Sequence, residues 1–290
     1  MKTIQLSLLL ISMMAVLSCN VINPAEDIPA YIHIDEFEMI SQPGFGSTSE
    51  KISEIWVYAN AGFIGAYDLP ANIPVISSGM TDLSFRAGIR DNGIASTRVQ
   101  YPFYEPYDVD LNLSPEKTDT VTPQFTYKED LPELPLLDDF ESGTFFNDTD
   151  DSQAEFELTQ LDDEVFEGNQ SGKVFMDENS TIFRAESEVF MELPSNRQAY
   201  IEMDYKCDNS FAIGLKAYDN GESTKNLALI LKETTDESGQ SQWNKIYIDL
   251  LPITSINPNA EYFELYLESL KDEGNSTATL YFDNIKVIHF

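Results

Sequence analysis

The segment QAYIEMDYKC at residues 198–207 shows the pattern that decides the fold class. Ile201, Met203, Tyr205 and Cys207 occupy every second position, and successive side chains of a strand point to opposite faces of its sheet. The segment therefore predicts a β-strand with these four side chains on one face. Because a free cysteine in such a position behaves as a small hydrophobe, we expect Cys207 to be a buried thiol rather than a reactive nucleophile.

Most other ordered segments share this character. They are short, rich in β-branched and aromatic residues, and bounded by Gly, Asn, Asp, Ser or Pro, as is typical of strands. The segments are EIWVYA (54–59), DLSFRAGI (82–89), FAIGLKAY (211–218), LALILKE (227–233), NKIYIDLL (244–251), YFELYLESL (262–270) and ATLYFDNIKVIHF (278–290). No helical stripe longer than about two turns accompanies them. The sequence predicts an all-β protein.

The chain is long enough for two compact domains, and residues 111–135 mark the boundary between them. This stretch is rich in proline and charge and has weak periodicity, which is typical of a terminal strand followed by a linker. We expect an immunoglobulin-like β-sandwich over residues 30–128, sized for that fold. A linker at 129–135 and a jelly-roll β-sandwich over residues 136–290 would follow.

The N-terminus predicts where the protein resides. An apolar run over residues 4–17 follows Lys2 and is too short to span a bilayer, so residues 1–18 are expected to form a signal peptide. The segment Val16-Leu17-Ser18-Cys19 resembles a bacterial lipobox, which implies that Cys19 carries acyl chains such as palmitate. An ordinary signal peptide with an incidental cysteine is the alternative. Residues 19–29 would be the tether.

Two or three acyl chains would give lasting membrane attachment. Asn20 after the cysteine, by resemblance to enterobacterial lipoproteins, favours the outer membrane. The expected location is the outer membrane, with the cell surface favoured over the periplasmic face. With Cys19 lipidated, Cys207 has no partner for an intramolecular disulfide.

Charge excludes one class of partner. The chain has 50 acidic and 17 basic residues and a formal net charge of −33, and such a field repels nucleic acid. The stretch 129–172 contains no Lys or Arg. It could gather divalent cations, but a solvated acidic face is the favoured interpretation.

Two resemblances refine the architecture. Residues 50–104, with Trp-Val-Tyr at 56–58, Ile-Gly-Ala-Tyr at 64–67 and Tyr-Pro-Phe-Tyr at 101–104, resemble the N-terminal β-sandwich of a family of Bacteroidota outer-membrane lipoproteins. LLDDFESG (136–143), WNKIYIDL (243–250) and LYFDNIKV (280–287) resemble segments of carbohydrate-binding-module-like jelly rolls.

The second resemblance implies a structural calcium ion. Its ligands would come from the first and last strands, at Asp139 or Glu141 and at Asp283. Carboxylates together with backbone carbonyls could supply the six to eight oxygens that calcium takes. The alternative is that these acids cap strand ends or face solvent.

Aromatic residues are the candidate contact residues. Alternation places Ile246, Ile248 and Leu250 on one face of their strand and leaves Trp243 and Tyr247 on the other; Tyr262 and Tyr266 are likewise opposite an apolar face. A second set, Tyr101, Phe103, Tyr104 and Tyr107, is expected to form an exposed strip in the first domain. Such residues suit sugar rings or protein interfaces, or they form cross-strand pairs that stabilise a sheet.

The remaining motifs suggest no reaction. No metal-binding or nucleophile motif is present, and paired carboxylates have no diagnostic value among 50 acids, so we expect no enzymatic activity. Thr120, in Asp119-Thr120-Val121, resembles a Bacteroidota O-glycosylation site. The leading hypothesis is a non-catalytic lipoprotein that docks as an accessory subunit on an outer-membrane β-barrel machine for assembly, secretion or uptake. The alternative is a surface lipoprotein whose jelly roll binds a polysaccharide.

Overall fold

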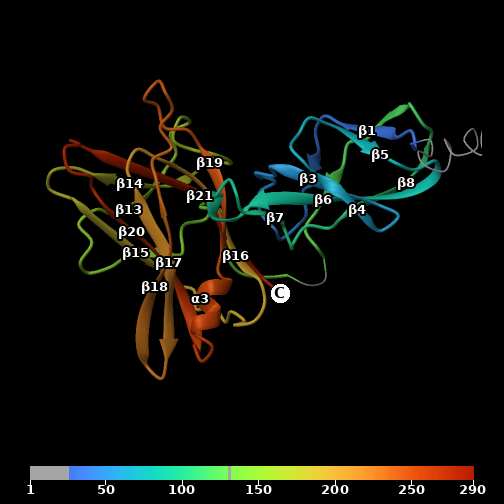
Figure 1. The fold of residues 1–290 in the computed structure, drawn as a ribbon. Coiled ribbons are helices and arrows are strands. Elements are labelled where there is room, and N and C mark those ends of the chain that lie inside the picture. The colour runs from blue at the N-terminus through green and yellow to red at the C-terminus, as the bar shows by residue number, and fades with distance from the viewer. Residues whose placement is uncertain (1–25, 130–131) are drawn as a thin grey trace, which may run out of the picture.

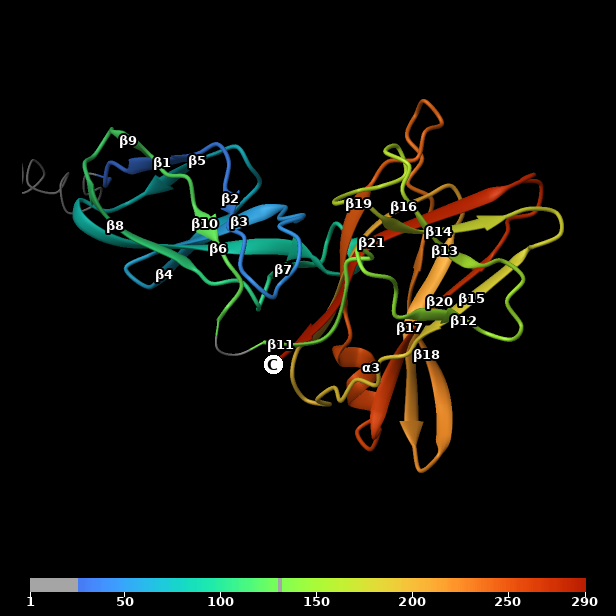
Figure 2. The same cartoon turned by 180° about the vertical axis from the view of Figure 1, so that it is seen from behind.

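The computed structural model describes residues 26–129 and 132–290, so the predicted signal peptide and Cys19 lie outside the described residues. The predicted all-β fold is confirmed. Two β-sandwich units follow one another along the chain and meet at one end of the first (Figures 1 and 2).

The first unit is built from ten strands of the described chain. They are β1 (Ala30–Ile34), β2 (Glu38–Met39), β3 (Glu54–Ala59), β4 (Gly62–Tyr67), β5 (Ala71–Val75), β6 (Gly79–Arg90), β7 (Arg98–Gln100), β8 (Tyr107–Leu113), β9 (Thr118–Thr120) and β10 (Gln124–Phe125), with the 3-10 turn η1 (Asp91–Gly93) after β6. A sheet ordered β4-β3-β6-β7, with β8 also paired to β6, faces the sheet β5-β1-β9 and the pair β10-β2. Buried Ile32, Ile73, Val57 and Phe85 fill the space between them.

Strand β6 positions the functional region. It is twelve residues long, and its N-terminal half pairs with β8 whereas its last residues pair with β7. Its end, Arg90, together with η1, reaches the second unit (Figure 1).

The second unit is an antiparallel sandwich of two larger sheets. Its elements are β11 (Glu133–Asp138), β12 (Phe146–Asp148), β13 (Phe156–Thr159), β14 (Ser171–Met176), β15 (Ile182–Ser187), β16 (Ala199–Cys207), β17 (Phe211–Asp219), β18 (Glu222–Leu231), β19 (Asn244–Asp249), α3 (Leu251–Ile256), β20 (Tyr262–Leu270) and β21 (Ala278–His289). One sheet has the order β13-β14-β21-β16-β19, with β11 added to β21, and the other has the order β12-β15-β20-β17-β18. Strand β11 begins inside the segment that the sequence predicted as linker.

Alternation explains the core of this unit. Ile201, Met203, Tyr205 and Cys207 of β16 point inward and pack on residues of the facing sheet such as Ile213. Cys207 is 1% exposed, which confirms the predicted buried thiol. Burial raises the pKa of this thiol to about 12, so it carries no thiolate at neutral pH.

The other face of β16 is not exposed to solvent. Tyr200, Tyr247 and Ile288, from β16, β19 and β21, belong to the same buried apolar cluster as the core of the first unit. The first unit therefore covers the part of this outer face that β16, β19 and β21 form, whereas Phe175 on the outer face of β14 is 47% exposed. The two units share a continuous packed interface. Among residues 26–129 and 132–290, no helix has the length and apolar character to cross a membrane.

Candidate functional site

The aromatic residues predicted as two separate binding surfaces pack on each other. The ring centroid of Tyr101 lies 4.9 Å from that of Tyr247 and 5.4 Å from that of Tyr200, and the hydroxyls of Tyr104 and Tyr247 are 3.2 Å apart. The prediction that Tyr101, Phe103, Tyr104 and Tyr247 are exposed is wrong, because all are at most 4% exposed. They are the contact surface between the two units of this chain.

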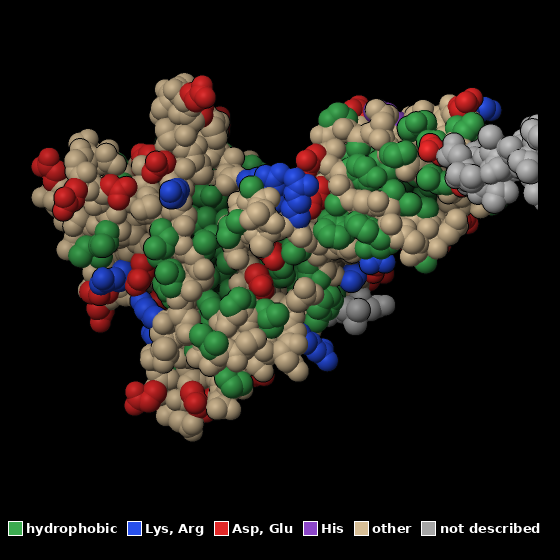
Figure 3. All heavy atoms as spheres, in the orientation of Figure 1, with side chains coloured by type: hydrophobic (Ala, Val, Ile, Leu, Met, Phe, Trp, Pro, Cys, Tyr) green, Lys and Arg blue, Asp and Glu red, His purple; other side chains and the backbone are tan. Residues whose placement is uncertain are grey.

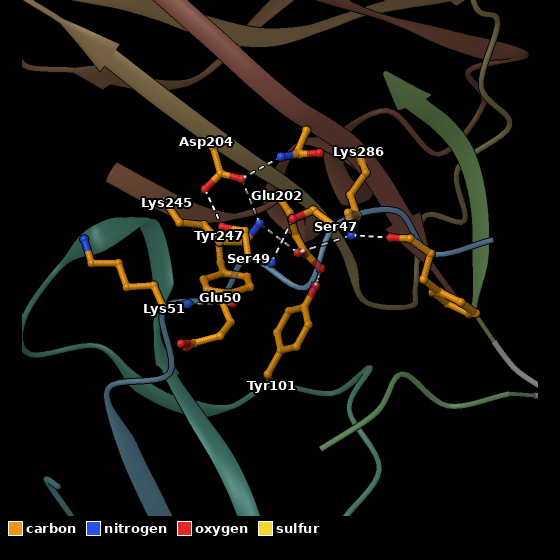
Figure 4. A network of polar contacts seen from close by, with 12 residues as sticks. Ser47, Ser49, Glu50, Lys51, Tyr101, Glu202, Asp204, Lys245, Tyr247 and Lys286 are labelled. Carbon is orange, nitrogen blue, oxygen red and sulfur yellow. Dashed lines mark hydrogen bonds and ion pairs between the residues drawn. The ribbon is translucent and has the colours of Figure 1, made fainter. Parts of the chain in front are cut away.

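A buried carboxylate lies under these rings (Figure 4). Glu202 is fully buried and accepts hydrogen bonds from the hydroxyl of Tyr101 at 2.5 Å and from that of Tyr127 at 2.9 Å. Burial alone would raise the pKa of Glu202, but Lys286, Lys245 and the two hydroxyls outweigh it and leave this pKa lowered. Burial also raises the pKa values of Tyr101 and Tyr127 far above their ordinary value, so both stay protonated donors.

Three further buried charges complete the cluster. Lys286 Nζ donates to the backbone carbonyl of Phe45 at 2.6 Å and to the Tyr127 hydroxyl at 3.0 Å. Lys245 Nζ lies 3.5 Å from Glu202 and 3.6 Å from Asp204, and the Ser49 hydroxyl donates to Asp204 at 2.7 Å. Two acids and two bases thus balance, which a buried ionic cluster requires. Because donors and acceptors come from both units, the cluster fixes how the units sit together.

A pocket of about 670 Å³ opens beside this cluster, at the junction of the units. Lys51, Ser53, Arg90, Asn92 and Gly93 line it from the first unit, and Tyr205 with residues 229–232 and 244–247 line it from the second. The second-unit residues come largely from β18 and β19, which are the edge strands of the two sheets. In Figure 3, Lys and Arg side chains gather at this junction.

Hydrogen bonds across the junction hold the pocket walls in place. The Lys51 backbone N–H donates to the Tyr247 hydroxyl at 3.1 Å, and the Lys51 ammonium donates to Asn244. On the opposite wall, the Asp249 backbone N–H donates to the side-chain carbonyl of Asn92 at 3.1 Å. Asn92 has a φ of 56°, in the left-handed region that asparagine tolerates better than most residues. The pocket is therefore formed before any ligand arrives.

Tyr262 and Tyr266 lie elsewhere, on the outer face of the β12-β15-β20-β17-β18 sheet. Tyr262 is partly exposed and stacks on Tyr218 with a centroid distance of 4.5 Å. The prediction that Tyr266 is exposed is wrong: this residue is 3% exposed, and the Lys225 ammonium lies 4.9 Å from its ring centroid. These are the cross-strand contacts of a stable sheet.

Trp243 and Tyr107 are partly exposed but lie apart from one another. Trp243 packs beside β19 against Phe166, with a centroid distance of 5.3 Å, and the Lys206 ammonium lies 5.2 Å from its ring centroid. Tyr107 packs on Phe85 inside the first unit. Trp243 directly precedes β19 of one sheet, whereas Tyr262 lies in β20 of the other, so the aromatic residues expected to form one sugar-binding face do not do so.

The residues predicted to bind calcium come together in the structure. Asp139, Glu141 and Asp283 line one pocket of about 220 Å³. Their oxygens already accept hydrogen bonds: Glu141 from Asn169 and Gln170, and Asp283 from Ser171, Glu167 N–H and Asn284 N–H. Burial raises the pKa of Asp283 to about 7. Among the described residues, no group of three His, Cys, Asp or Glu side chains is arranged to hold a metal. The predicted structural calcium ion stays a prediction.

Thr120 lies in β9, paired in parallel with β1, rather than in a linker. Its side chain is exposed. The predicted modification of Thr120 stays a prediction.

Comparisons with known proteins give similarities of fold only. No protein-family model matches the chain, and no curated protein matches it. A family 61 carbohydrate-binding module in complex with β-1,4-galactotriose matches with 13% identity and a TM-score of 0.37, over 53% of this chain and 97% of its own. A family 11 carbohydrate-binding module from Clostridium thermocellum matches with 11% identity and a TM-score of 0.39, over 55% and 96%. A carbohydrate-binding module of the β-sandwich superfamily matches with 15% identity and a TM-score of 0.39, over 91% and 99%.

Proposed function

We propose that this chain is a non-catalytic glycan-binding lipoprotein of the outer membrane that holds its ligand in the pocket between its two units. The observation that carries the proposal is the pocket itself, because residues from both units build it and hydrogen bonds across the junction fix its walls. Its volume of about 670 Å³ falls within the range of small-molecule binding sites.

The lining offers the two kinds of contact that a sugar makes. Asn92, Asn244 and Ser53 carry amide and hydroxyl groups that can bond sugar hydroxyls. Leu229, Ile230 and Ile246 supply an apolar wall for the C–H face of a ring. A fixed set of polar groups on an apolar wall is the usual composition of such a site.

The same lining argues against catalysis. None of the residues that line the pocket is Asp, Glu, His or Cys, whereas glycoside hydrolysis uses a pair of carboxylic acids that flank the scissile bond. The proposal therefore assigns binding and no turnover. Anchoring through Cys19 is the part of the proposal that rests on the sequence.

Docking on an outer-membrane β-barrel machine is the less favoured function. The expected docking interface was an exposed strip at Tyr101, Phe103, Tyr104 and Tyr107, and the first three are buried against the second unit. A detergent pull-down of the full-length protein from its native membrane distinguishes the two functions. A barrel recovered at equal stoichiometry would support docking, and recovery of the lipoprotein alone would support glycan capture.

Binding to a glycan array, followed by calorimetric titration, tests the proposal directly. Ile230 is 59% exposed and lines the pocket, whereas Leu227 on the same strand is 54% exposed and does not. Ile230→Ala removes apolar contact area of about 1–2 kcal/mol, so we expect affinity to fall about 5- to 30-fold, with Leu227→Ala unchanged. Equal affinities for both variants and the wild type would place the ligand elsewhere.

A further inference from the structure

The residues that line the junction pocket carry positive charge, whereas the chain as a whole is strongly negative. The protein has 50 acidic and 17 basic residues, close to three acids for each base. The pocket lining contains Lys51, Arg90, Lys232 and Lys245 and no acidic residue. A local reversal of charge at a preformed concave site indicates a ligand of negative charge.

Three of these four cations, Lys51, Arg90 and Lys232, have no ion-pair partner among the described residues. Within the described chain, no carboxylate lies within 4.0 Å of Lys51, Arg90 or Lys232, although seven other Lys and Arg residues have such partners. Arg90 Nε is buried and has no hydrogen-bond acceptor among the described residues, whereas the buried Lys245 Nζ has Glu202 and Asp204 as ion-pair partners. A buried polar group without a partner is costly, and an anionic ligand would supply the acceptor that the Arg90 guanidinium lacks.

Nearby acids do not cancel this charge. Glu202 and Asp204 lie behind Lys245, but Lys286 balances one of them. The carboxylate of Glu50 is turned to the backbone N–H of Ile52 at 2.6 Å. Burial, followed by the positive charge of Arg90, lowers the pKa of Lys51, as expected where cations crowd together.

We propose that the ligand of the pocket is an acidic glycan, one of whose carboxylate or sulfate groups binds between Arg90, Lys51 and Lys232. This inference rests on the proposed glycan-binding function and names its substrate class. A guanidinium group presents a planar pair of donors that matches a carboxylate or sulfate, and lysine adds a point charge. The apolar wall at Ile230 and Ile246 then contacts the ring that carries the acid.

The overall net charge of −33 makes this inference specific to the pocket. A polyanion is repelled by the protein as a whole, so acidic-glycan binding has to come from the local cations. Loss of a cation outside the pocket should therefore leave affinity unchanged.

Calorimetric titration of the full-length protein in detergent tests the inference with three probes. They are a hexamer of α-1,4-galacturonate, a chondroitin sulfate oligosaccharide and neutral cellohexaose. We expect one or both acidic probes to bind and cellohexaose to bind at least tenfold more weakly. A preference for galacturonate identifies a carboxylate ligand, and a preference for chondroitin sulfate identifies a sulfate ester.

Two variants and one control assign the effect to the pocket. Arg90→Gln and Lys232→Gln each remove a charge-assisted contact, which corresponds to about a tenfold loss of affinity. Lys117→Gln removes the same charge from the turn between β8 and β9 and should have no effect. Lys232 is exposed and unpaired, so its variant decides the question even if Arg90→Gln alters folding.

The failures of the two proposals are distinguishable. If cellohexaose binds as tightly as the acidic probes and both pocket variants keep wild-type affinity, the acidic-ligand inference is overturned while glycan binding stands. If no glycan on the array and none of the three probes binds the wild-type protein, both proposals are overturned.

Discussion

The substitution Glu202→Gln removes a buried charge. It should weaken the contact between the two units more than the neutralisation of any solvent-exposed charged residue would. In Glu202→Gln the side chain keeps an oxygen that can accept from Tyr101 or Tyr127. Lys245 then keeps only Asp204 as an ion-pair partner, and Lys286 loses the one carboxylate that lies within 4.0 Å of it among the described residues. Breaking a buried ion pair by removing one partner typically costs 3–5 kcal/mol. Because one acceptor survives, we expect the free energy of unfolding to fall by about 3 kcal/mol.

Equilibrium urea unfolding followed by tryptophan fluorescence measures this loss in both units, since Trp56 lies in the first unit and Trp243 in the second. Glu157→Gln is the matched control, because Glu157 is exposed on β13 and exposed charges contribute little. A loss below 1 kcal/mol for Glu202→Gln, equal to that of Glu157→Gln, would refute the claim that a buried ionic cluster joins the units.

The effect should depend on pH in a defined direction. The pKa of Glu202 is lowered in the folded protein, so its contribution to stability is present above the unfolded value and is lost as pH falls through the folded value. The difference between wild type and Glu202→Gln should therefore be largest near neutral pH and shrink below about pH 4. A difference that grows on acidification would contradict this assignment of charge.

Three other predictions concern residues outside the pocket. Trp243→Ala should leave glycan affinity within about twofold of wild type, because Trp243 does not line the pocket; a loss of tenfold or more in calorimetry would move the site to that ring. Cys207, with a pKa raised by burial to about 12, should resist Ellman's reagent in the native protein and react only in denaturant, and rapid native labelling would contradict its burial. Asp283→Asn should stabilise the protein at pH 8, because burial raises the pKa of Asp283 to about 7 and its contribution to stability is lost as pH rises through that value. The gain in the free energy of unfolding, measured with urea, should shrink towards pH 6. A gain that is constant with pH would show that Asp283 does not titrate there.

The sequence could predict the direction of side chains but not what covers them. Tyr247 was correctly placed opposite Ile246 and Ile248, which pack in the jelly-roll core. The error was to equate the outward face with the solvent face, because the first unit covers β19, β16 and β21. Alternation along a strand reports which face a residue belongs to, whereas coverage of that face depends on contacts between distant segments.

The junction pocket could not be predicted for a related reason. Lys51, Arg90, Lys232 and Lys245 are spread over much of the chain, and no spacing or motif connects them. The sequence does carry one sign of the buried ionic cluster: Glu202, Lys245 and Lys286 lie within largely apolar strands. Charged residues buried in such strands need partners, and here the partners come from the other unit.

The most direct test of the account is a crystal structure of the full-length protein with the acidic oligosaccharide that binds best in solution. The account predicts that a carboxylate or sulfate group of the ligand lies within hydrogen-bond distance of Arg90, with a sugar ring against Ile230. An oligosaccharide bound instead at Tyr262 on the opposite sheet, or at Trp243, with the junction pocket unchanged, would contradict it.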